Sequence, residues 1–573
     1  MKVRIARVAG FCMGVRRAMD MALAASRDAA GPVFTYGPLI HNPSALALLE
    51  ARGIHVLREI PERGEGTVII RAHGVPPEEK ARLAAAGFRI LDATCGRVVK
   101  VQMIVRRHAE AGDTCLLVGD PGHPEVVGIL GHAGGRGRLV STEADIEALE
   151  DPGPYIVVAQ TTQDRERFEA WSRRILARFP GGRVYNTICH STHKRQAEVR
   201  RLAAECDAVV VVGGRQSANT RRLAEIAEET GRAAFAVETD RDLDRAALSR
   251  FRRVGVTAGA STPNWIINRV VREIEALPGR HESALRRLLY RAVRFLLESN
   301  AWTAACGAAL AWAAARVLGR PGVLPAAPLA AAGFVFAVHT LYRLLDHEAG
   351  RYNDPLRARF VSQHKGFMAA ASAAALAGAL AAAAHLGRLA LPFLLSLAGL
   401  AALYCAQLLP AVRRHRLARH VPGSKALLVA LAWSSVAVLM PGDAWRPPWN
   451  GEVLAVFGLA AVLVYIRSVL LEILDVQGDQ IVGLETLPVL VGEKRALLLV
   501  RLLAVALALA AAGPVLAGLA PRRLLAFVPA AAYLLALTIP FEKRRMGQNL
   551  RLEAATEGAC LVLLAAALAP LSP

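Results

Sequence analysis

The spacing of apolar and polar positions divides the chain into two halves of different character. Up to about residue 277, short apolar runs alternate with amphipathic stretches, and turns rich in Gly and Pro separate them. This alternation of strand and helix patterns predicts an α/β protein. From about residue 293 the chain is rich in Ala and Leu, with long runs free of charge, which predicts helices that span a membrane.

The second half predicts an all-α polytopic membrane domain of about nine helices. The apolar segments lie near 293–318, 323–345, 367–387, 389–412, 425–441, 452–471, 496–519, 522–540 and 556–571. Residues 278–292 link the halves, and the stretch 277–295 around them combines a cationic face with Leu, Tyr and Phe side chains. This stretch indicates an interfacial helix, and an ordinary domain linker is the alternative.

The 573 residues carry a net charge of +21, and its distribution points to a membrane. The first half has no basic stripe interleaved with aromatic residues, so no nucleic acid is expected as a partner. In the second half cationic residues gather in alternate loops, such as RRHRLARH and EKRRMGQNLR. By the positive-inside rule, these loops and the first half face the cytoplasm, in a multi-pass protein of the inner (cytoplasmic) membrane.

The eight cysteines lack the close pairing of a disulfide framework. Cys12, Cys95 and Cys189 share one setting, in which a strand end or turn leads into a helical pattern with basic residues. Their nearly equal separations indicate one α/β unit used three times. At a helix N-terminus the macrodipole lowers the pKa of a thiol. Three such thiolates would hold an iron–sulfur cluster with one iron open, and three unrelated core cysteines are the alternative.

Polar side chains follow other predicted strands, in turns that lead into helices. They are His41, His73, His123, Glu125, Thr161, Ser217, Asn219 and Ser261. Helix N-termini with Ser, Thr and Asn caps bind phosphate oxygens, so the set predicts an anion site beside the thiols. For each residue taken alone, a simple helix cap or a structural histidine is the alternative.

Together these motifs resemble the 4-hydroxy-3-methylbut-2-enyl diphosphate reductase family, also called IspH/LytB. GFCMGVRRA, GPLIHNP, RAHGVPP, DATCGRVVKVQ, GHPEVVGI, NTICHSTHKRQ, SANTRRLAE and VTAGASTP follow the family's order within residues 1–277. The resemblance implies an α/β trefoil of three similar modules around a [4Fe–4S] cluster held by Cys12, Cys95 and Cys189. It also implies reduction of (E)-4-hydroxy-3-methylbut-2-enyl diphosphate to isopentenyl and dimethylallyl diphosphate, the last step of the non-mevalonate isoprenoid pathway.

The resemblance assigns expected roles to the polar set. Glu125 is the expected proton source, oriented through Thr161, and the closed cavity should raise its pKa. The diphosphate is expected to bind without Mg²⁺ to His41, His73, His123, Ser217, Asn219 and Ser261, with His123 also counted in the catalytic set. Ala218 departs from the family, which usually has a serine there.

Electrons are expected from an external donor such as a ferredoxin or flavodoxin. A redox sensor that kept the cluster is the alternative to an enzyme, and the intact Glu125 and histidines argue against it.

An acidic stretch in the second half places Glu472, Asp475 and Asp479 at i, i+3 and i+7 on one face of a helix. Carboxylates at a membrane are costly unless functional, and a cluster of them suits Mg²⁺ bridging a diphosphate. A solvated helix end is the alternative. EILDVQGDQIVGLETLPVLVG and VPGSKALLVALAW resemble UbiA-type prenyltransferases, a likeness that covers about residues 285–573 and predicts a UbiA-like transmembrane domain over 293–573.

The segment YRLLDHEAGRYNDP matches the first aspartate motif of that superfamily only in part. Asp346 is kept for Mg²⁺, but Tyr342 stands at the expected Asn and Gly350 at the second Asp. The candidates to replace them are His347, Glu348, Asn353 and Asp354. If active, this domain should transfer a prenyl group to an aromatic or other lipid-like acceptor, with Lys425 stabilising the leaving diphosphate. A non-catalytic anchor or prenyl-lipid binder is the alternative.

Overall fold

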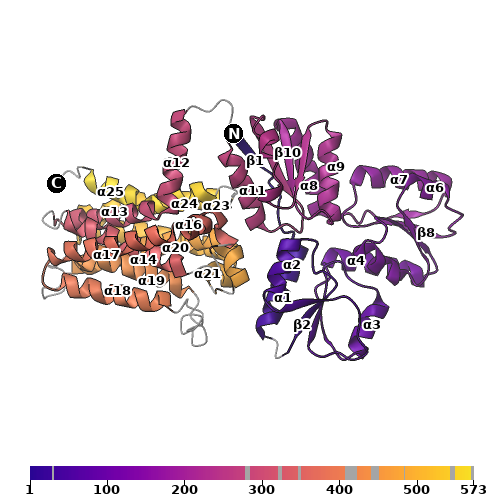
Figure 1. Cartoon of the computed structure of the whole chain (residues 1–573), viewed down its shortest axis with the longest axis horizontal. Helices are drawn as coiled ribbons and strands as arrows, with labels where there is room; N and C mark the ends of the chain where they lie inside the picture. The colour runs from indigo at the N-terminus through magenta and orange to yellow at the C-terminus, as the bar shows by residue number, and fades with distance from the viewer. Residues whose placement is uncertain are drawn as a thin grey trace. The chain divides into compact units, whose positions relative to one another are not determined.

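The computed structural model divides the chain into two compact units. The described residues are 1–28, 31–277, 284–320, 325–345, 350, 352–406, 423–440, 451–482, 484, 486–542 and 549–569. The N-terminal unit covers residues 1–282, and the C-terminal unit contains the helices from α12 (Ala284–Glu298) onward (Figure 1).

Within its described residues, the N-terminal unit contains three four-stranded parallel sheets (Figure 1). Their spatial orders are β3-β2-β4-β5, β7-β6-β8-β9 and β11-β10-β12-β1. The strands are β1 (Lys2–Ile5), β2 (Val33–Tyr36), β3 (Ile54–Leu57), β4 (Thr67–Ile70), β5 (Arg89–Asp92), β6 (Thr114–Val118), β7 (Gly137–Val140), β8 (Tyr155–Ala159), β9 (Arg183–Val184), β10 (Ala208–Val212), β11 (Ala233–Val237) and β12 (Arg253–Ala258). The predicted α/β fold is confirmed.

All three sheets share one strand order, which makes the first strand of the chain part of the last module. In the first two sheets the chain visits the second position, then the first, the third and the fourth, and β10, β11 and β12 follow the same path through the first three steps of the third sheet. In the third sheet β1 takes the fourth position and pairs with β12, from Lys2 opposite Arg253 to Ile5 opposite Val256. The repeated unit is therefore present three times, and the third copy is completed by the N-terminus.

The central strands are apolar on both faces because helices cover both sides of each sheet. Every residue of β4 (TVII), β8 (YIVVA) and β10 (AVVVV) is buried. The helices are α1 (Met13–Asp28), α2 (Pro43–Glu50), α3 (Pro77–Ala85), α4 (Gly96–Glu110), α5 (Pro124–Leu130), α6 (Glu143–Glu147), α7 (Arg165–Arg178), α8 (His190–Glu205), α9 (Ala218–Glu229), α10 (Arg245–Leu248) and α11 (Asn264–Ala276).

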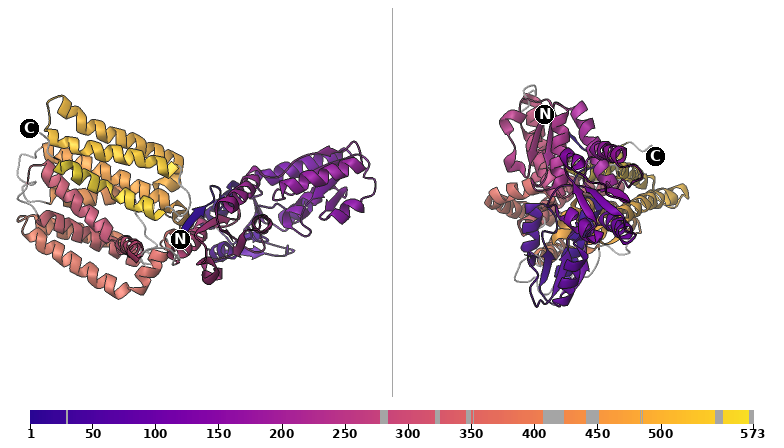
Figure 2. Two further views of the ribbon diagram at one scale, coloured as in Figure 1. Left: turned by 90° about the horizontal axis from the view of Figure 1, so that it is seen from above. Right: turned by 90° about the vertical axis from the view of Figure 1, so that its right-hand side faces the viewer.

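The C-terminal unit is a bundle whose long helices lie side by side (Figure 2). After α12 come α13 (Ala301–Val317), α14 (Ala326–Leu345), α16 (Pro355–Gln363), α17 (Lys365–Ala384), α18 (Ala390–Ala406), α19 (Ser424–Ser434), α20 (Gly451–Val482), α21 (Leu487–Val491), α22 (Glu493–Leu516), α23 (Phe527–Glu542), α24 (Asn549–Glu557) and α25 (Ala559–Leu568). Five helical stretches among the described residues are long and apolar enough to cross a membrane. Each predicted apolar segment overlaps a helix of this bundle.

Two helices differ from the sequence-based expectation. The segment 293–318, expected as one helix, is split between α12 and α13 at Asn300, whose φ is 67°. Asn tolerates this left-handed conformation better than most residues, and the Asn300 amide donates to the hydroxyl of Thr340 at 3.0 Å. The helix expected at 452–471 continues to Val482, so the acidic cluster lies on regular helix.

The topology predicts that the expected cluster site at Cys12, Cys95 and Cys189 depends on strand β1. We expect a chain of residues 1–277 to fold and stay soluble without detergent, because its three sheets are complete. Deletion of residues 2–5 should leave β12 without its edge strand and lower the amount of bound iron. Circular dichroism, size-exclusion chromatography and iron analysis would compare the two, and equal iron contents would contradict the role given to β1.

Candidate active site

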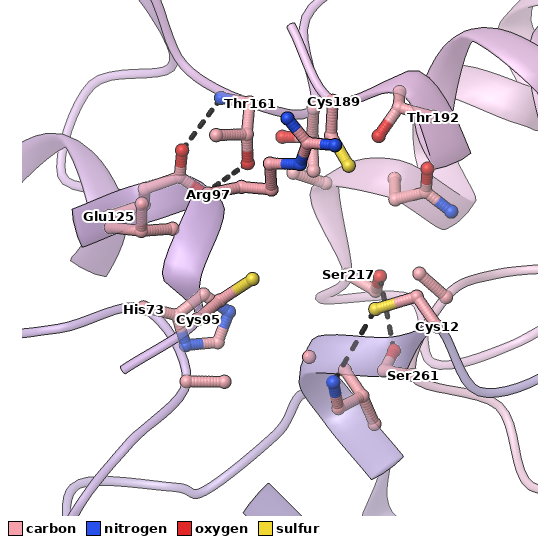
Figure 3. Close-up of a pocket in the computed structure, with 18 of the residues that line it drawn as sticks. Cys12, His73, Cys95, Arg97, Glu125, Thr161, Cys189, Thr192, Ser217 and Ser261 are labelled. Atoms are coloured by element: carbon pink, nitrogen blue, oxygen red, sulfur yellow. Dashed lines mark hydrogen bonds between the residues drawn. The ribbon is translucent and has the colours of Figure 1, made fainter. Parts of the chain in front are cut away.

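A cavity of about 740 Å³, including its open mouth, lies within the N-terminal unit (Figure 3). All of the site residues predicted from the sequence of this unit line the cavity: Cys12, His41, His73, Cys95, His123, Glu125, Thr161, Cys189, Ser217, Asn219 and Ser261. Residues as far apart in the sequence as Cys12 and Ser261 therefore share one site.

The common strand order explains why these residues meet. Positions here are counted along the spatial order of each sheet. The strands at the second position lead to His41, His123 and Ser217, and those at the third position lead to His73, Thr161 and Ser261. The strands at the fourth position lead to Cys95, Cys189 and Cys12. The carboxyl ends of parallel strands lie at one edge of a sheet, which is where ligands bind in such folds. Each module thus contributes one thiol and two polar side chains from equivalent loops.

The same backbone hydrogen bond holds each cysteine. The N–H groups of Cys12, Cys95 and Cys189 donate to the carbonyls of Ala260, Ala72 and Thr161 at 3.0, 2.9 and 2.9 Å. Each acceptor follows the third strand of its sheet, so the bond extends the strand pairing by one step. Cys95 and Cys189 are the N-cap residues of α4 and α8, and Cys12 directly precedes α1. In Figure 3 the three sulfur atoms point into the cavity.

The sequence predicts a lowered thiol pKa at a helix N-terminus, and for Cys95 this prediction is wrong. Burial raises the pKa of the Cys95 thiol, and the N–H groups of Arg97 and Val98 offset this only in part. The neighbouring thiols of Cys12 and Cys189 raise the pKa further, because two thiolates repel each other. Binding to a metal centre reverses this balance, since ligating thiols give up their protons.

The donor set fits an iron–sulfur cluster. All three thiols are free and line the cavity, whereas the free thiols of Cys115 and Cys206 are buried away from it. Space for the ligands depends on Gly14, where an added Cβ would lie 2.6 Å from Sγ of Cys95. Three soft thiolate ligands suit a [4Fe–4S] cluster with one iron left for another ligand.

Three histidines lie against one another in the cavity. Their ring centroids are 4.7 Å apart for His41 and His73, 5.7 Å for His41 and His123, and 5.4 Å for His73 and His123. Burial lowers the pKa of all three rings, well below its usual value for His73 and to about 4 for His123. The rings are therefore neutral at pH 7, and each can offer an N–H donor to an anion.

Hydroxyl and amide groups add further donors. Ser217 is the N-cap residue of α9, and its hydroxyl oxygen accepts from Ser261 at 3.4 Å. Asn219 is 4% exposed, and neither atom of its amide has a hydrogen-bond partner among the described residues. Buried polar atoms without partners are rare, which indicates a ligand at this place. Ala218 lines the cavity where the family resemblance predicts a serine.

Glu125 is the buried acid of the cavity, with 2% of its surface exposed. Its carboxylate accepts hydrogen bonds from the N–H of Thr161 at 2.6 Å and from the Thr161 hydroxyl at 3.0 Å (Figure 3). Burial raises the pKa of Glu125 to about 7, although both bonds act against this. The Glu125 N–H donates to Nδ1 of His123 at 3.1 Å, which leaves the ring proton on Nε2.

Further polar residues line the cavity without having been indicated by the sequence, among them Arg97, Ser191 and Thr192. Arg97 lies in the first turn of α4 after Cys95, and Thr192 in the first turn of α8 after Cys189. Thr192 is 5% exposed. Their common signal is a polar residue two or three positions after a ligand cysteine, where helical side chains point back toward the N-terminus.

Comparison with known proteins identifies this unit. The family model for LytB protein matches residues 3–275. A 4-hydroxy-3-methylbut-2-enyl diphosphate reductase from Geobacter sulfurreducens is 42% identical over 275 residues, which are 48% of this chain and 97% of the relative. The chain belongs to this reductase family. A solved structure of (E)-4-hydroxy-3-methyl-but-2-enyl diphosphate reductase, 40% identical, covers 48% of this chain and 99% of its own, with a TM-score of 0.39.

The C-terminal unit has its own cluster of candidate residues, on α20 beyond the reductase unit. Glu472 and Asp479 are 5% and 1% exposed, and Asp475 lies between them on the same helix. Both carboxylate oxygens of Glu472 lack a hydrogen-bond partner among the described residues. A buried carboxylate in this state requires a cation or a proton nearby.

The region of the first aspartate motif approaches this cluster. Asn353 donates from its side-chain amide to Asp479 at 2.9 Å, so one of the expected replacements does reach the second motif. The ammonium group of Lys425 lies 5.0 Å from the centre of the Tyr342 ring. Asp346 lies outside the described residues.

Solved UbiA homologues are similar to the rest of the chain. The homologue from Archaeoglobus fulgidus, determined with GPP and Mg²⁺ bound, is 20% identical and covers 48% of this chain and 98% of its own, with a TM-score of 0.35. At this level of similarity, the activity of the C-terminal unit must be argued from its own residues.

The contact between Gly14 and Cys95 predicts a steric effect on cluster binding. We expect Gly14→Ala to lower the iron content of the full-length chain several-fold, because the new carbon would lie 2.6 Å from Sγ of Cys95. Gly96→Ala is the matched control, since an added Cβ there has nothing within 4 Å. Iron per chain after anaerobic purification is the measurement. Equal iron in both variants would contradict the packing of Gly14 against this ligand.

Proposed function

We propose that the reductase unit converts (E)-4-hydroxy-3-methylbut-2-enyl diphosphate to isopentenyl and dimethylallyl diphosphate. The reaction takes up two electrons and two protons and releases the allylic hydroxyl as water. One observation carries the proposal: three free thiols, one buried acid and three neutral histidines line a single cavity. Relatives that this unit matches over almost their whole length are named for this activity.

Cys12, Cys95 and Cys189 would hold a [4Fe–4S] cluster. When bound, such a cluster supplies electrons one at a time, together with a Lewis-acidic iron. An external protein such as a ferredoxin or flavodoxin would provide the electrons. The contribution of the polypeptide is to bind the substrate, orient it and transfer protons.

The diphosphate would bind to the neutral donors. His41, His73 and His123 present ring N–H groups, and Ser217, Asn219 and Ser261 present hydroxyl and amide groups. The unpartnered amide of Asn219 gains hydrogen bonds on binding, which favours the complex. An anion beside the buried histidines raises their pKa values, so we expect proton uptake when the substrate binds.

Glu125 would hold the proton that the substrate receives. Its pKa of about 7 means that both protonation states are well populated near neutral pH. The hydrogen bonds from Thr161 fix the orientation of the carboxyl group. Thr161 also accepts the N–H of Cys189, so the acid and one cluster ligand are positioned by the same residue.

Loss of the Glu125 proton should limit the reaction at high pH. We expect the rate to fall as pH rises through about 7, because the deprotonated carboxylate cannot donate. Glu125→Gln should lower kcat by about 10²–10⁴-fold and leave the iron content unchanged. Glu143→Gln, at an exposed position of α6, is the control. Anaerobic assays across pH would test this, and near-parental activity of Glu125→Gln would exclude Glu125 as the proton source.

We further propose that the C-terminal unit transfers a prenyl group from an isoprenoid diphosphate to an aromatic or other lipid-like acceptor. Support comes from Glu472, Asp475 and Asp479 on one membrane helix, of which Glu472 and Asp479 are buried, since such carboxylates suit Mg²⁺ that bridges a diphosphate. Lys425 would add positive charge for the leaving group. Tyr342 and Gly350, which replace two expected Mg²⁺ ligands, favour the second candidate, a non-catalytic anchor or prenyl-lipid binder.

The proposed location is the inner membrane, with the reductase unit in the cytoplasm. Basic loops between the apolar segments support this orientation. A cytoplasmic site would also give the cluster a reducing environment and access to soluble electron donors. The leucines of α12 at positions 285, 288 and 289 are 65%, 65% and 56% exposed, which supports contact of this helix with membrane lipid.

Removal of one carboxylate separates the two candidates for the C-terminal unit. We expect Asp475→Asn in the full-length chain to abolish Mg²⁺-dependent prenyl transfer and to leave the reductase activity unchanged. Glu542→Gln, a carboxylate that pairs with Arg501 at the end of α23, is the control. The assay would supply long-chain prenyl diphosphates and candidate acceptors in detergent or lipid. Absence of transfer in the parent chain, with intact reductase activity, would support the anchor instead.

A further inference from the structure

Arg195, in the second turn of α8, is the largest fully buried side chain of the described residues, with 1% of its surface exposed. No carboxylate among the described residues forms an ion pair with it, and its Nε atom has no hydrogen-bond partner there. Arg222, a less buried arginine of the same unit, pairs with Asp120 and Glu225. Arg195 is therefore a buried cation without the paired carboxylate that usually offsets the cost of burying a charge.

The guanidinium joins two segments that present cluster ligands. Nη1 donates to the carbonyl of Ala258 at 3.1 Å, at the end of β12, and Nη2 donates to the carbonyl of Gly10 at 2.6 Å. Gly10 lies two residues before Cys12, and Arg195 itself lies six residues after Cys189. One side chain thus connects the helix that begins at the Cys189 ligand with the turn that carries the Cys12 ligand.

The thiolates of two cluster ligands, Cys12 and Cys189, are the negative charges that act on Arg195. Burial lowers the pKa of the guanidinium, and the thiolates of Cys12 and Cys189 act in the opposite direction. Backbone carbonyls carry only partial charges, so they cannot neutralise a buried cation. Arginine keeps its proton in such surroundings, and its positive charge therefore remains beside the thiols.

We propose that Arg195 is a positioning residue whose fixed positive charge raises the reduction potential of the cluster. The inference rests on the proposed cluster at Cys12, Cys95 and Cys189. Each electron that the centre accepts from the external donor adds one negative charge beside Arg195. In a buried, weakly screened environment this charge stabilises the reduced form over the oxidised form.

Three variants of the full-length chain separate charge from geometry. Arg195→Gln removes the charge and keeps an amide donor, whereas Arg195→Lys keeps the charge and cannot make both carbonyl bonds. Arg201→Gln is the control on the same helix, since Arg201 pairs with Glu198 and Glu205. Iron and sulfide are counted first, and the midpoint potential is then measured anaerobically by a redox titration followed by electron paramagnetic resonance.

We expect Arg195→Gln to lower the equilibrium constant for one-electron reduction at least tenfold, a shift of about 59 mV toward more negative potential. Arg195→Lys and Arg201→Gln should stay within about threefold of the parent. A loaded Arg195→Gln protein at the parental potential would overturn the proposal. If that variant does not load, a tenfold shift in loaded Arg195→Lys would overturn it as well. A parent chain without iron would instead refute the proposed function.

Discussion

The reductase unit depends on the pairing of β1 with β12. This contact puts the first strand of the chain at the edge of the third sheet and sets Cys12 at the carboxyl end of that strand. Lys2 lies opposite Arg253, so the contact closes a loop that contains nearly the whole unit. Closing a long loop costs conformational entropy, and the buried strands beside it supply the compensating apolar burial. Without this pairing the other two modules could present only two thiols.

Burial then sets the protonation of the cavity, with opposite effects on acids and bases. It raises the pKa of Glu125 and Cys95 and lowers the pKa of the three histidines, because in each case it disfavours the charged form. The result is a largely neutral pocket before ligands arrive. Such a pocket has donors for an anionic substrate and an acid that is still partly protonated near pH 7, while Arg195 holds a permanent positive charge beside the segments that carry Cys12 and Cys189.

Much of this arrangement could be predicted from the sequence, because motifs that carry chemistry are local. The three cysteines, the histidines and Glu125 each stand out beside a strand end, and the structure brings them into one cavity. The pairing of β1 with β12, which completes the third sheet, could not be predicted, since no local sequence pattern indicates which strands pair. The pKa of Cys95 was missed for a similar reason, because burial and the approach of two other thiols depend on tertiary structure.

In the C-terminal unit, too, the sequence predicts the local elements but not the contacts between distant segments. Apolar segments predict its helices, but the break at Asn300 depends on a hydrogen bond to Thr340 on another helix. The contact of Asn353 with Asp479 likewise joins residues from distant segments. The sequence pattern identifies the carboxylates of α20, and only the fold shows that Glu472 is buried with both oxygens unpartnered.

Iron and sulfide counts in the anaerobically purified full-length chain and its single-cysteine variants show whether Cys12, Cys95 and Cys189 together hold a cluster. The account predicts about four iron and four sulfide per parent chain, from one [4Fe–4S] cluster. Cys12→Ser, Cys95→Ser and Cys189→Ser should each remove most of the iron and sulfide. Cys115→Ser and Cys206→Ser should retain them. Full iron in any of the first three variants, or loss of iron in either of the last two, would contradict a cluster held by this set of thiols.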